Sequence, residues 1–366
     1  MSILIETNNT VYPVVPEANN YHPIQQKPAT VVSQSKKVAK KSSKIKIIAI
    51  VSIIAVVVVI IIAVAVVLAV LLSQNCRYGK LNGVCIECGV TYSSSKIVGG
   101  QNAGYSSWPS IVYIQFKYYY LSSGNTYSIS TSCAGTLVNQ DTVVTAAHCY
   151  NTELQLSDGS TLTVSPNSYH ATYESMYTVY LGLYDKSDLS SGVSRSVKSY
   201  TIHSNYDDPN VLNDIAIIKL SSTVDLSEKI QVSCLPEDSD IYPENSDIDA
   251  YIVGWGKTSS AALTTPDILQ EALVTVYDSS KCSLVSIGTL KNWQSQICAG
   301  KYEGGIDTCQ GDSGGPLFVK DTVDSKQKFI LTGVTSYGEG CAEVGKPGIY
   351  TRVSAFIDWI EEKMNE

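Results

Sequence analysis

Cysteine is absent from the first 75 residues, and all ten cysteines of this 366-residue chain follow them. An even number of cysteines confined to one part of the chain indicates disulfides formed in an oxidising compartment. A zinc site is the alternative explanation, but Cys85 and Cys88 form the only Cys-x-x-Cys pair, and no second pair or histidine cluster completes four ligands. The sequence therefore predicts disulfides and no metal site.

Positive charge is scarce beyond the N-terminal segment. Residues 1–46 contain seven lysines and two acidic residues, a net charge of +5. The whole chain carries −8, so the remaining residues carry −13 with histidine taken as neutral. An acidic bulk of this kind argues against nucleic acid as a partner and is explained by solubility.

One long apolar run covers residues 47–72 and is interrupted only by Ser52. As a helix rising about 1.5 Å per residue, it exceeds the roughly 30 Å hydrocarbon core of a membrane. A cleaved signal peptide is the alternative, with an apolar region of about 7–15 residues near the N-terminus and a small-residue cleavage site. This run is longer, begins later and ends without such a site, so we expect a retained transmembrane helix.

The charges on the two sides of this run predict its direction. Six lysines lie within residues 36–46, whereas only Arg77 and Lys80 follow closely on the other side. An excess of positive charge stays in the cytoplasm, so we expect a single-pass type II protein of the cell membrane, with its C-terminal part extracellular. Residues 1–46 are polar and contain proline, which favours a disordered cytoplasmic tail.

Three segments carry residue types that together suit nucleophilic catalysis. His148, one of only four histidines, follows an apolar strand-like run. Asp214 immediately precedes the apolar run 215–220. A carboxylate there is costly unless it accepts hydrogen bonds, so Asp214 is suited to orient an imidazole. Ser313 lies among the glycines of segment 311–315, which allow a tight turn that exposes its hydroxyl and directs backbone N–H groups at an oxyanion.

In this order, the three segments resemble the chymotrypsin/trypsin family, and the resemblance covers residues 97–366. It implies an all-β fold of two six-stranded antiparallel β-barrels with the triad between them, followed by a C-terminal helix. Short strand-like runs bounded by Gly, Ser and Asn agree with this fold. For the helix we expect Ser354 as N-cap and one apolar face. Further matching segments are 97–100, 254–256, 336–338 and 347–350.

The resemblance implies a mechanism and, with it, roles for individual residues. His148 is the general base, Asp214 orients it, Ser313 is the nucleophile, and the N–H groups of Gly311 and Ser313 form the oxyanion hole. A catalytically inert homologue that acts as a membrane-bound binding module is the alternative. No cofactor is implied, and we expect no calcium where Leu183 replaces a Glu ligand of trypsin.

The resemblance also implies a substrate preference. Asp307 occupies the floor of the primary specificity pocket, where a carboxylate selects polypeptides with Lys or Arg at the cleaved bond. Gly338 and Gly348 leave the pocket open to a long side chain. Ser336, Tyr337 and Gly338 pair with the substrate backbone as an added strand, although Tyr337 stands where many relatives have Trp. Protein protease inhibitors are further implied partners.

Residues 73–96 resemble the stem and activation segment of type II transmembrane serine proteases. Cleavage after Lys96 would free the amine of Ile97 to pair with Asp312 and complete the peptidase domain, residues 97–366, so the chain is expected to be a zymogen. A stem disulfide would keep the cleaved enzyme tethered. The implied pairs are Cys133–Cys149, Cys282–Cys298, Cys309–Cys341, Cys88–Cys234 and Cys76–Cys85.

Two segments are longer than in pancreatic trypsin. One is the Tyr-, Ser- and Thr-bearing stretch 150–180, which follows His148, and the other begins at residues 117–120. They either shape the rim of the cleft or are tolerated surface insertions.

Overall fold

The computed structural model describes residues 35–72, 76–91, 100–122, 124–150, 152–155, 159–164, 173–237, 241–287 and 290–366. The chain divides into two compact units, Met1–Gln74 and Asn75–Glu366.

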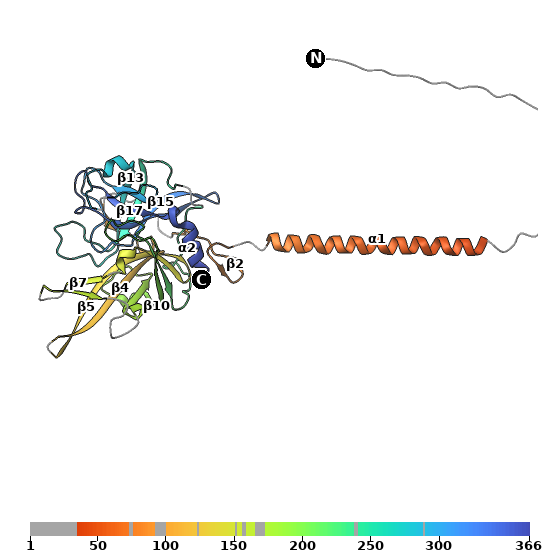
Figure 1. Cartoon of the computed structure of the whole chain (residues 1–366), viewed down its shortest axis with the longest axis horizontal. Helices are drawn as coiled ribbons and strands as arrows, with labels where there is room; N and C mark the ends of the chain where they lie inside the picture. The colour runs from red at the N-terminus through yellow and green to blue at the C-terminus, as the bar shows by residue number, and fades with distance from the viewer. Residues whose placement is uncertain are drawn as a thin grey trace, which may run out of the picture. The chain divides into compact units, whose positions relative to one another are not determined.

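The first unit contains the helix α1, Ser35–Leu72 (Figure 1). Among the described residues, it is the one helix that is long and apolar enough to cross a membrane, over Lys46–Ala65. It begins at Ser35, inside the segment expected to be a disordered tail, rather than at the start of the apolar run. Lysine and alanine both have favourable helix propensities, so the apolar helix continues backwards through them.

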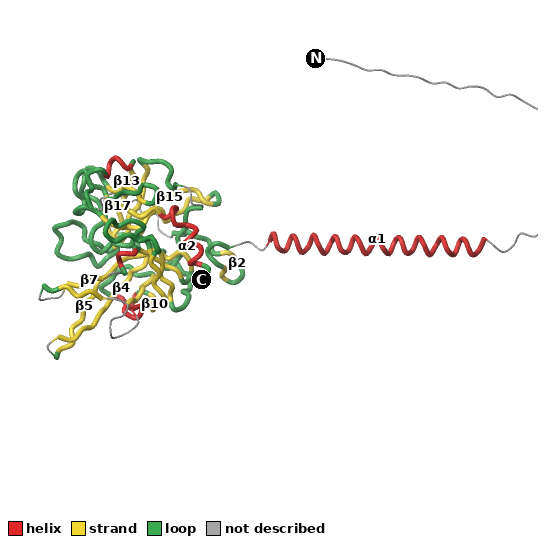
Figure 2. The backbone as a smooth tube through the Cα atoms, in the orientation of Figure 1, coloured by secondary structure: helices red, strands yellow, loops and turns green. Residues whose placement is uncertain are grey.

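The second unit begins its main fold with a closed antiparallel barrel of six strands in the order β10-β11-β6-β5-β4-β9 (Figures 1 and 2). Strand β9 alternates buried and partly buried residues, whereas every residue of β11 is buried. The bounds are β4 Ile111–Ser122, β5 Asn125–Asn139, β6 Thr142–Thr145, β9 Tyr177–Leu181, β10 Val193–Ile202 and β11 Ala216–Leu220.

The second barrel has the order β12-β15-β16-β17-β14-β13 and is closed by pairing of β12 with β13, while β3 (Gln101–Asn102) adds to the outer edge of β13. The all-β prediction of two six-stranded barrels is therefore confirmed. The bounds are β12 Ile248–Gly254, β13 Gln270–Tyr277, β14 Gln296–Gly300, β15 Pro316–Val323, β16 Lys326–Tyr337 and β17 Gly348–Arg352.

A shared core joins the barrels and the C-terminal helix. Trp108 stacks on Phe318 with ring centroids 5.3 Å apart and meets Phe329 edge-on at 4.7 Å. The chain ends in a 3-10 turn, Val353–Phe356, and the helix α2, Ile357–Met364. The expected apolar face is buried in this core, but the expected cap is wrong. Ser354 accepts a hydrogen bond from the backbone N–H of Tyr242 at 3.1 Å instead.

Each of the two segments that are longer than in pancreatic trypsin contains a β-hairpin. Both hairpins lie in the part of the chain that forms the first barrel. Strands β4 and β5 pair from Ile111↔Thr136 out to Ser122↔Asn125, far beyond the barrel wall (Figure 1). The stretch after His148 contains a second hairpin, β7 (Thr152–Gln155) with β8 (Thr161–Val164).

Five disulfides cross-link the second unit, and they are the five implied pairs. Two involve the stem, where β1 (Lys80–Leu81) and β2 (Val84–Cys85) form a small hairpin. Cys88–Cys234 then joins the stem to the barrels. Gly89 is required beside this bond, because a Cβ there would lie 2.8 Å from the Sγ of Cys234 and φ is +65°.

Non-covalent contacts also hold the stem on the barrels. The Arg77 guanidinium donates to Glu361 at 2.6 Å and to the carbonyl oxygens of Leu235 and Pro236 at 3.4 and 2.6 Å. The Gly89 N–H donates to the Val232 carbonyl at 2.8 Å. The stem is thus part of the fold of the unit rather than a loose connector.

We expect Arg77→Ala to lower the free energy of unfolding by about 1–3 kcal/mol, because it removes hydrogen bonds to a carboxylate and to partly buried carbonyl groups. Arg195→Ala is the matched control. Arg195 also donates to backbone carbonyls, at 2.9 to 3.3 Å, but on an exposed surface, so its loss should stay within about 0.5 kcal/mol. Denaturant titration of the purified chain measures both, and equal losses would contradict a structural role of the stem.

Candidate active site

The pairing of strands β6 and β11 in the first barrel brings His148 and Asp214 together. Strand β6 leads into a single 3-10 turn, Ala147–Cys149, and β6 pairs with β11 from Thr145↔Ala216. Continued by two residues, this register places the turn beside Asp214. The His148 N–H donates to Asp214 Oδ1 at 2.9 Å, and its ring Nδ1 lies 2.8 Å from Asp214 Oδ2.

The Asp214 carboxylate is fully buried and balanced by internal donors. Ser336 donates its hydroxyl to Asp214 Oδ2 at 2.5 Å, and Thr351 donates to the Asp214 backbone carbonyl at 2.7 Å. Burial acts to raise the pKa of Asp214, but the charge and hydrogen bond of His148, together with Ser336, outweigh it and lower the pKa. Asp214 therefore remains ionised and accepts a hydrogen bond from the Nδ1–H of His148.

The same contact controls the imidazole. Burial acts to lower the pKa of His148, but the Asp214 carboxylate outweighs it, with a smaller effect of Asp208, and the pKa is raised above its ordinary value. Because Nδ1–H donates to a carboxylate, the neutral ring presents Nε2 as its base. The ring is partly open to solvent, with its side chain 28% exposed.

The turn that carries Ser313 packs directly against the segment before His148. The Ala134 N–H of β5 donates to the Ser313 carbonyl at 2.8 Å, and the Gly314 N–H donates to Thr335 at 2.9 Å. A Cβ on Gly314 would lie 2.2 Å from Thr145 Oγ1, and its φ is +75°. Only glycine allows this approach of the two segments.

The structure leaves three polar groups of this turn available for a ligand. Within the described part of the chain, the N–H groups of Gly311 and Ser313 donate to no protein acceptor, and Ser313 Oγ makes no hydrogen bond with His148 Nε2. The trio is thus brought to one site without a formed Ser–His hydrogen bond. Such bonds are often long in unliganded sites and shorten when substrate binds.

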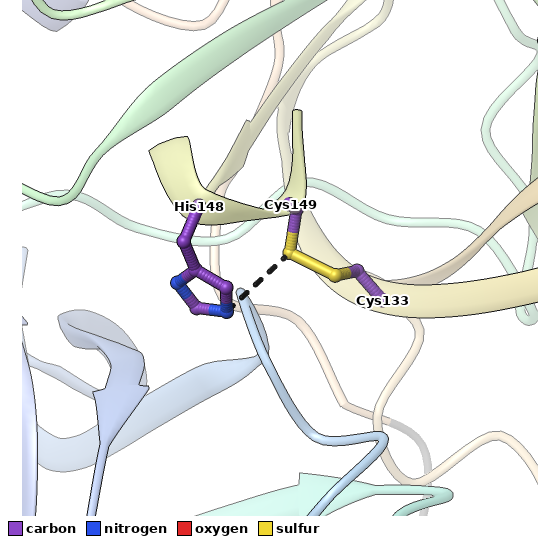
Figure 3. A group of neighbouring side chains, drawn as sticks. All are labelled: Cys133, His148 and Cys149. Atoms are coloured by element: carbon purple, nitrogen blue, oxygen red, sulfur yellow. Dashed lines mark hydrogen bonds between the residues drawn. A yellow bond between two sulfur atoms is a disulfide. The ribbon is translucent and has the colours of Figure 1, made fainter. Parts of the chain in front are cut away.

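Figure 3 shows a group that resembles a metal site, in which Cys133, His148 and Cys149 offer ligand atoms within 4.8 Å of one another. The two sulfur atoms are bonded to each other at 2.00 Å, so neither is a thiolate. His148 Nε2 lies 4.0 Å from the Cys149 sulfur. This disulfide instead fixes the turn that carries His148 to strand β5.

Asp307 lies beside Gly348. Its carboxylate accepts hydrogen bonds from the N–H groups of Thr308 at 2.8 Å and Ala342 at 3.3 Å. Burial nevertheless raises its pKa to about 7. A Cβ on Gly348 would lie 3.0 Å from Asp307 Oδ1, whereas one on Gly338 would meet only Gly340 O at 3.7 Å and Gly348 Cα at 4.0 Å. Gly348 therefore keeps open the space beside the carboxylate, whereas no atom of Asp307 lies within 4 Å of a Cβ on Gly338.

Tyr337, expected to contact substrate, is positioned by its neighbours. Gln296 donates to the Tyr337 hydroxyl and to the Val211 carbonyl, both at 3.3 Å. The Lys291 ammonium lies 5.2 Å from the centre of the Tyr337 ring.

Asp312 is a second carboxylate in an enclosed place, 8% exposed. It accepts from the N–H groups of Gly256 at 2.7 Å and Cys309 at 3.0 Å, and burial raises its pKa to about 6. A Cβ on Gly254 or Gly256 would lie 2.0 or 2.2 Å from its oxygens. A cavity of about 180 Å³ adjoins it and is also lined by Asp307.

No lysine or arginine among the described residues forms an ion pair with Asp307 or Asp312. The expected partner of Asp312, Ile97, and the expected cleavage residue, Lys96, lie outside the described residues.

Sequence reasoning missed two residues around this site. Thr351, which bonds the backbone of Asp214, and Glu271, a buried acid beside the Asp312 cavity, belong to no short motif. A signal for Glu271 was available, since an acidic residue in the apolar run of β13 is costly unless it is bonded.

Comparison with known proteins agrees with this geometry. The trypsin family model matches residues 97–360, which include His148, Asp214 and Ser313. A relative, Transmembrane protease serine 11C of Mus musculus, is 32% identical over 283 residues, or 77% of this chain. The match covers 57% of that relative, so the chain spans little more than half its length. With two closed barrels and a family match over most of its length, the chain belongs to the trypsin family.

Proposed function

We propose that this protein is a membrane-anchored serine endopeptidase that cleaves after Lys or Arg and is made as a zymogen. The observation that carries the proposal is the fully buried Asp214, bonded to His148 and Ser336, beside the glycine-held turn of Ser313. An inert binding module would have no need of a buried carboxylate that raises the pKa of a neighbouring imidazole.

In the proposed mechanism, His148 Nε2 takes the proton of Ser313 Oγ as the oxygen attacks the scissile carbonyl carbon. Asp214 keeps the ring oriented and stabilises the imidazolium. The N–H groups of Gly311 and Ser313 hold the oxyanion, and loss of one such donor typically costs about 2.7–4 kcal/mol of barrier. The imidazolium then protonates the leaving amine, and water hydrolyses the acyl-enzyme with His148 again as base.

The preference for Lys or Arg is supported by the state of Asp307. Two backbone donors do not compensate its burial, as its pKa raised to about 7 indicates. A cationic side chain entering between Gly338 and Gly348 would supply the missing charge.

Activation follows from the same reasoning applied to Asp312. Cleavage after Lys96 would create a new amine at Ile97, whose charge can pair with Asp312 inside the adjoining cavity and fix the turn that holds Gly311 and Ser313. Lys96 fits the proposed specificity, so the enzyme can activate itself.

Attachment to the cell membrane, with the peptidase outside, is supported by three observations. These are the span within α1, the lysines that precede it and the disulfides that follow it. The relative named above is itself described as a transmembrane protease. Polypeptides are the proposed substrates, with protein protease inhibitors as further partners.

We expect Ser313→Ala to reduce hydrolysis of an arginine reporter peptide by at least about a thousandfold, because no other group can form the acyl-enzyme. Ser283→Ala, at an exposed serine, is the control and should leave the rate unchanged. Thermal unfolding shows whether both variants are folded. A rate near that of the wild type in a folded Ser313→Ala protein would rule out the proposed nucleophile.

The pH dependence of cation binding should report Asp307. With its pKa raised to about 7, its carboxyl is neutral below this pH and charged above it. A small guanidinium ligand should therefore bind the activated Ser313→Ala chain more tightly as pH rises through neutrality, and about tenfold more weakly for each unit below the pKa. Calorimetry measures this without the effect of His148 on turnover. The same dependence in Asp307→Asn would mean that another group holds the cation.

We expect Lys96→Gln to yield a single chain that hydrolyses reporter peptides very poorly. The cleaved wild type should run as two pieces on a reducing gel and as one without reductant, because Cys88–Cys234 joins the pieces. Cys88→Ser should separate into two pieces on the non-reducing denaturing gel. Full activity of the uncleaved Lys96→Gln chain would exclude activation at this bond.

A further inference from the structure

Glu271 is a buried acid for which the proposed mechanism has no use. It lies in β13 with 1% of its surface exposed. Its Oε2 accepts from Trp108 Nε1 at 2.5 Å, and its Oε1 accepts from Gln101 Nε2 at 3.1 Å. Within the described residues, no cation forms an ion pair with it. Two neutral donors in fixed directions therefore hold this carboxylate and are held by it.

One of these donors, Gln101, belongs to a very short strand, which is also held by the Ala103 N–H that donates to the Leu269 carbonyl at 2.8 Å. Strand β3 consists of Gln101 and Asn102, and it pairs only with the outer edge of β13, in the register Gln101↔Glu271. So short an edge strand is marginal by its backbone pairing alone. The partly buried bond from Gln101 to Glu271 thus adds a side-chain anchor to the register.

This anchor lies at the cavity of Asp312. Gly100, which precedes Gln101, lines that cavity together with Glu271 and Asp312. Under the proposed activation, Ile97 becomes a free N-terminus three residues before Gly100. Three residues reach at most about 10–11 Å when extended. With so short an arm, the position of its base decides how often the amine meets Asp312.

We propose that Glu271 is a positioning residue for activation, which holds Gln101 and thereby the base of the new N-terminal arm at the mouth of the Asp312 cavity. The inference rests on the proposed cleavage at Lys96. It adds a requirement beyond cleavage, namely that Gln101, at the base of the arm, is held in place by Glu271.

The test uses the cleaved full-length chain and two readouts of the Ile97 amine. One is the alkaline limb of the pH profile of kcat/KM, which falls when the amine loses its proton. The other is the rate at which cyanate modifies the amine. In Gln101→Ala, which removes the donor, and in Gln101→Glu, which places two carboxylates face to face, the limb should move about one unit lower and modification should be about tenfold faster, since one pKa unit is a tenfold change.

An exchange of roles provides the rescue. The double variant Glu271→Gln with Gln101→Glu places the donor on β13 and the acceptor on β3, while the new amide oxygen can still accept from Trp108. We expect it to restore most of the alkaline limb and of the protection from cyanate. Failure of the exchange to restore either readout, in a variant with wild-type thermal stability, would overturn the proposal.

Asn102→Ala is the matched control on the same strand. It removes the exposed hydrogen bond between Asn102 and Gln270, 2.8 Å long, and should leave both readouts unchanged. Wild-type behaviour of Gln101→Ala, or an equal shift in Asn102→Ala, would also contradict the inference. Gln101→Ala remains informative if Gln101→Glu does not fold. Failure of the activation proposal itself looks different, because the uncleaved Lys96→Gln chain would then be as active as the cleaved wild type.

Discussion

The burial of carboxylates is the constraint on which the two-barrel unit depends. A carboxylate withdrawn from water needs donors or a cation, and the three important ones differ in how this need is met. Asp214 is balanced inside the protein by His148 and Ser336, and its pKa is lowered. Asp307 and Asp312 each have two backbone donors, and burial raises their pKa to about 7 and about 6. The charge of Asp214 is therefore balanced within the site, whereas Asp307 and Asp312 are suited to bind cationic partners from outside it.

One disulfide lies beside both of the carboxylates whose pKa is raised. Cys309 donates its N–H to Asp312, and Ala342, which follows Cys341, donates to Asp307. The bond between Cys309 and Cys341 thus links the two loops that serve the two carboxylates. Local backbone geometry around both charges is fixed by one covalent cross-link, which helps to explain how loops can position groups this closely.

Much of the fold and site could be predicted because the information is local. The His, Asp and Ser of the site each lie in a short run whose residue types follow from the chemistry, and strand-like runs outline the barrels. What could not be predicted depends on distant contacts. Ser354 resembles a helix cap, but its partner Tyr242 lies 112 residues away. Glu271 bonds residues more than 160 positions earlier, and the start of α1 at Ser35 lies in a lysine-rich segment that suits a solvated tail equally well.

If Lys96 is cut as proposed, the stem and the peptidase domain become two polypeptides that a disulfide joins. Before cleavage, Cys88–Cys234 closes a loop of one chain and acts on its unfolded ensemble. Afterwards, the same bond joins two polypeptides, and the contacts of Arg77 and Gly89 become an interface between subunits. Reduction would then make reassembly a bimolecular event that depends on concentration. The uncleaved precursor can refold as a single chain. After cleavage and reduction, the stem and the peptidase domain separate, and dilution slows their reassociation.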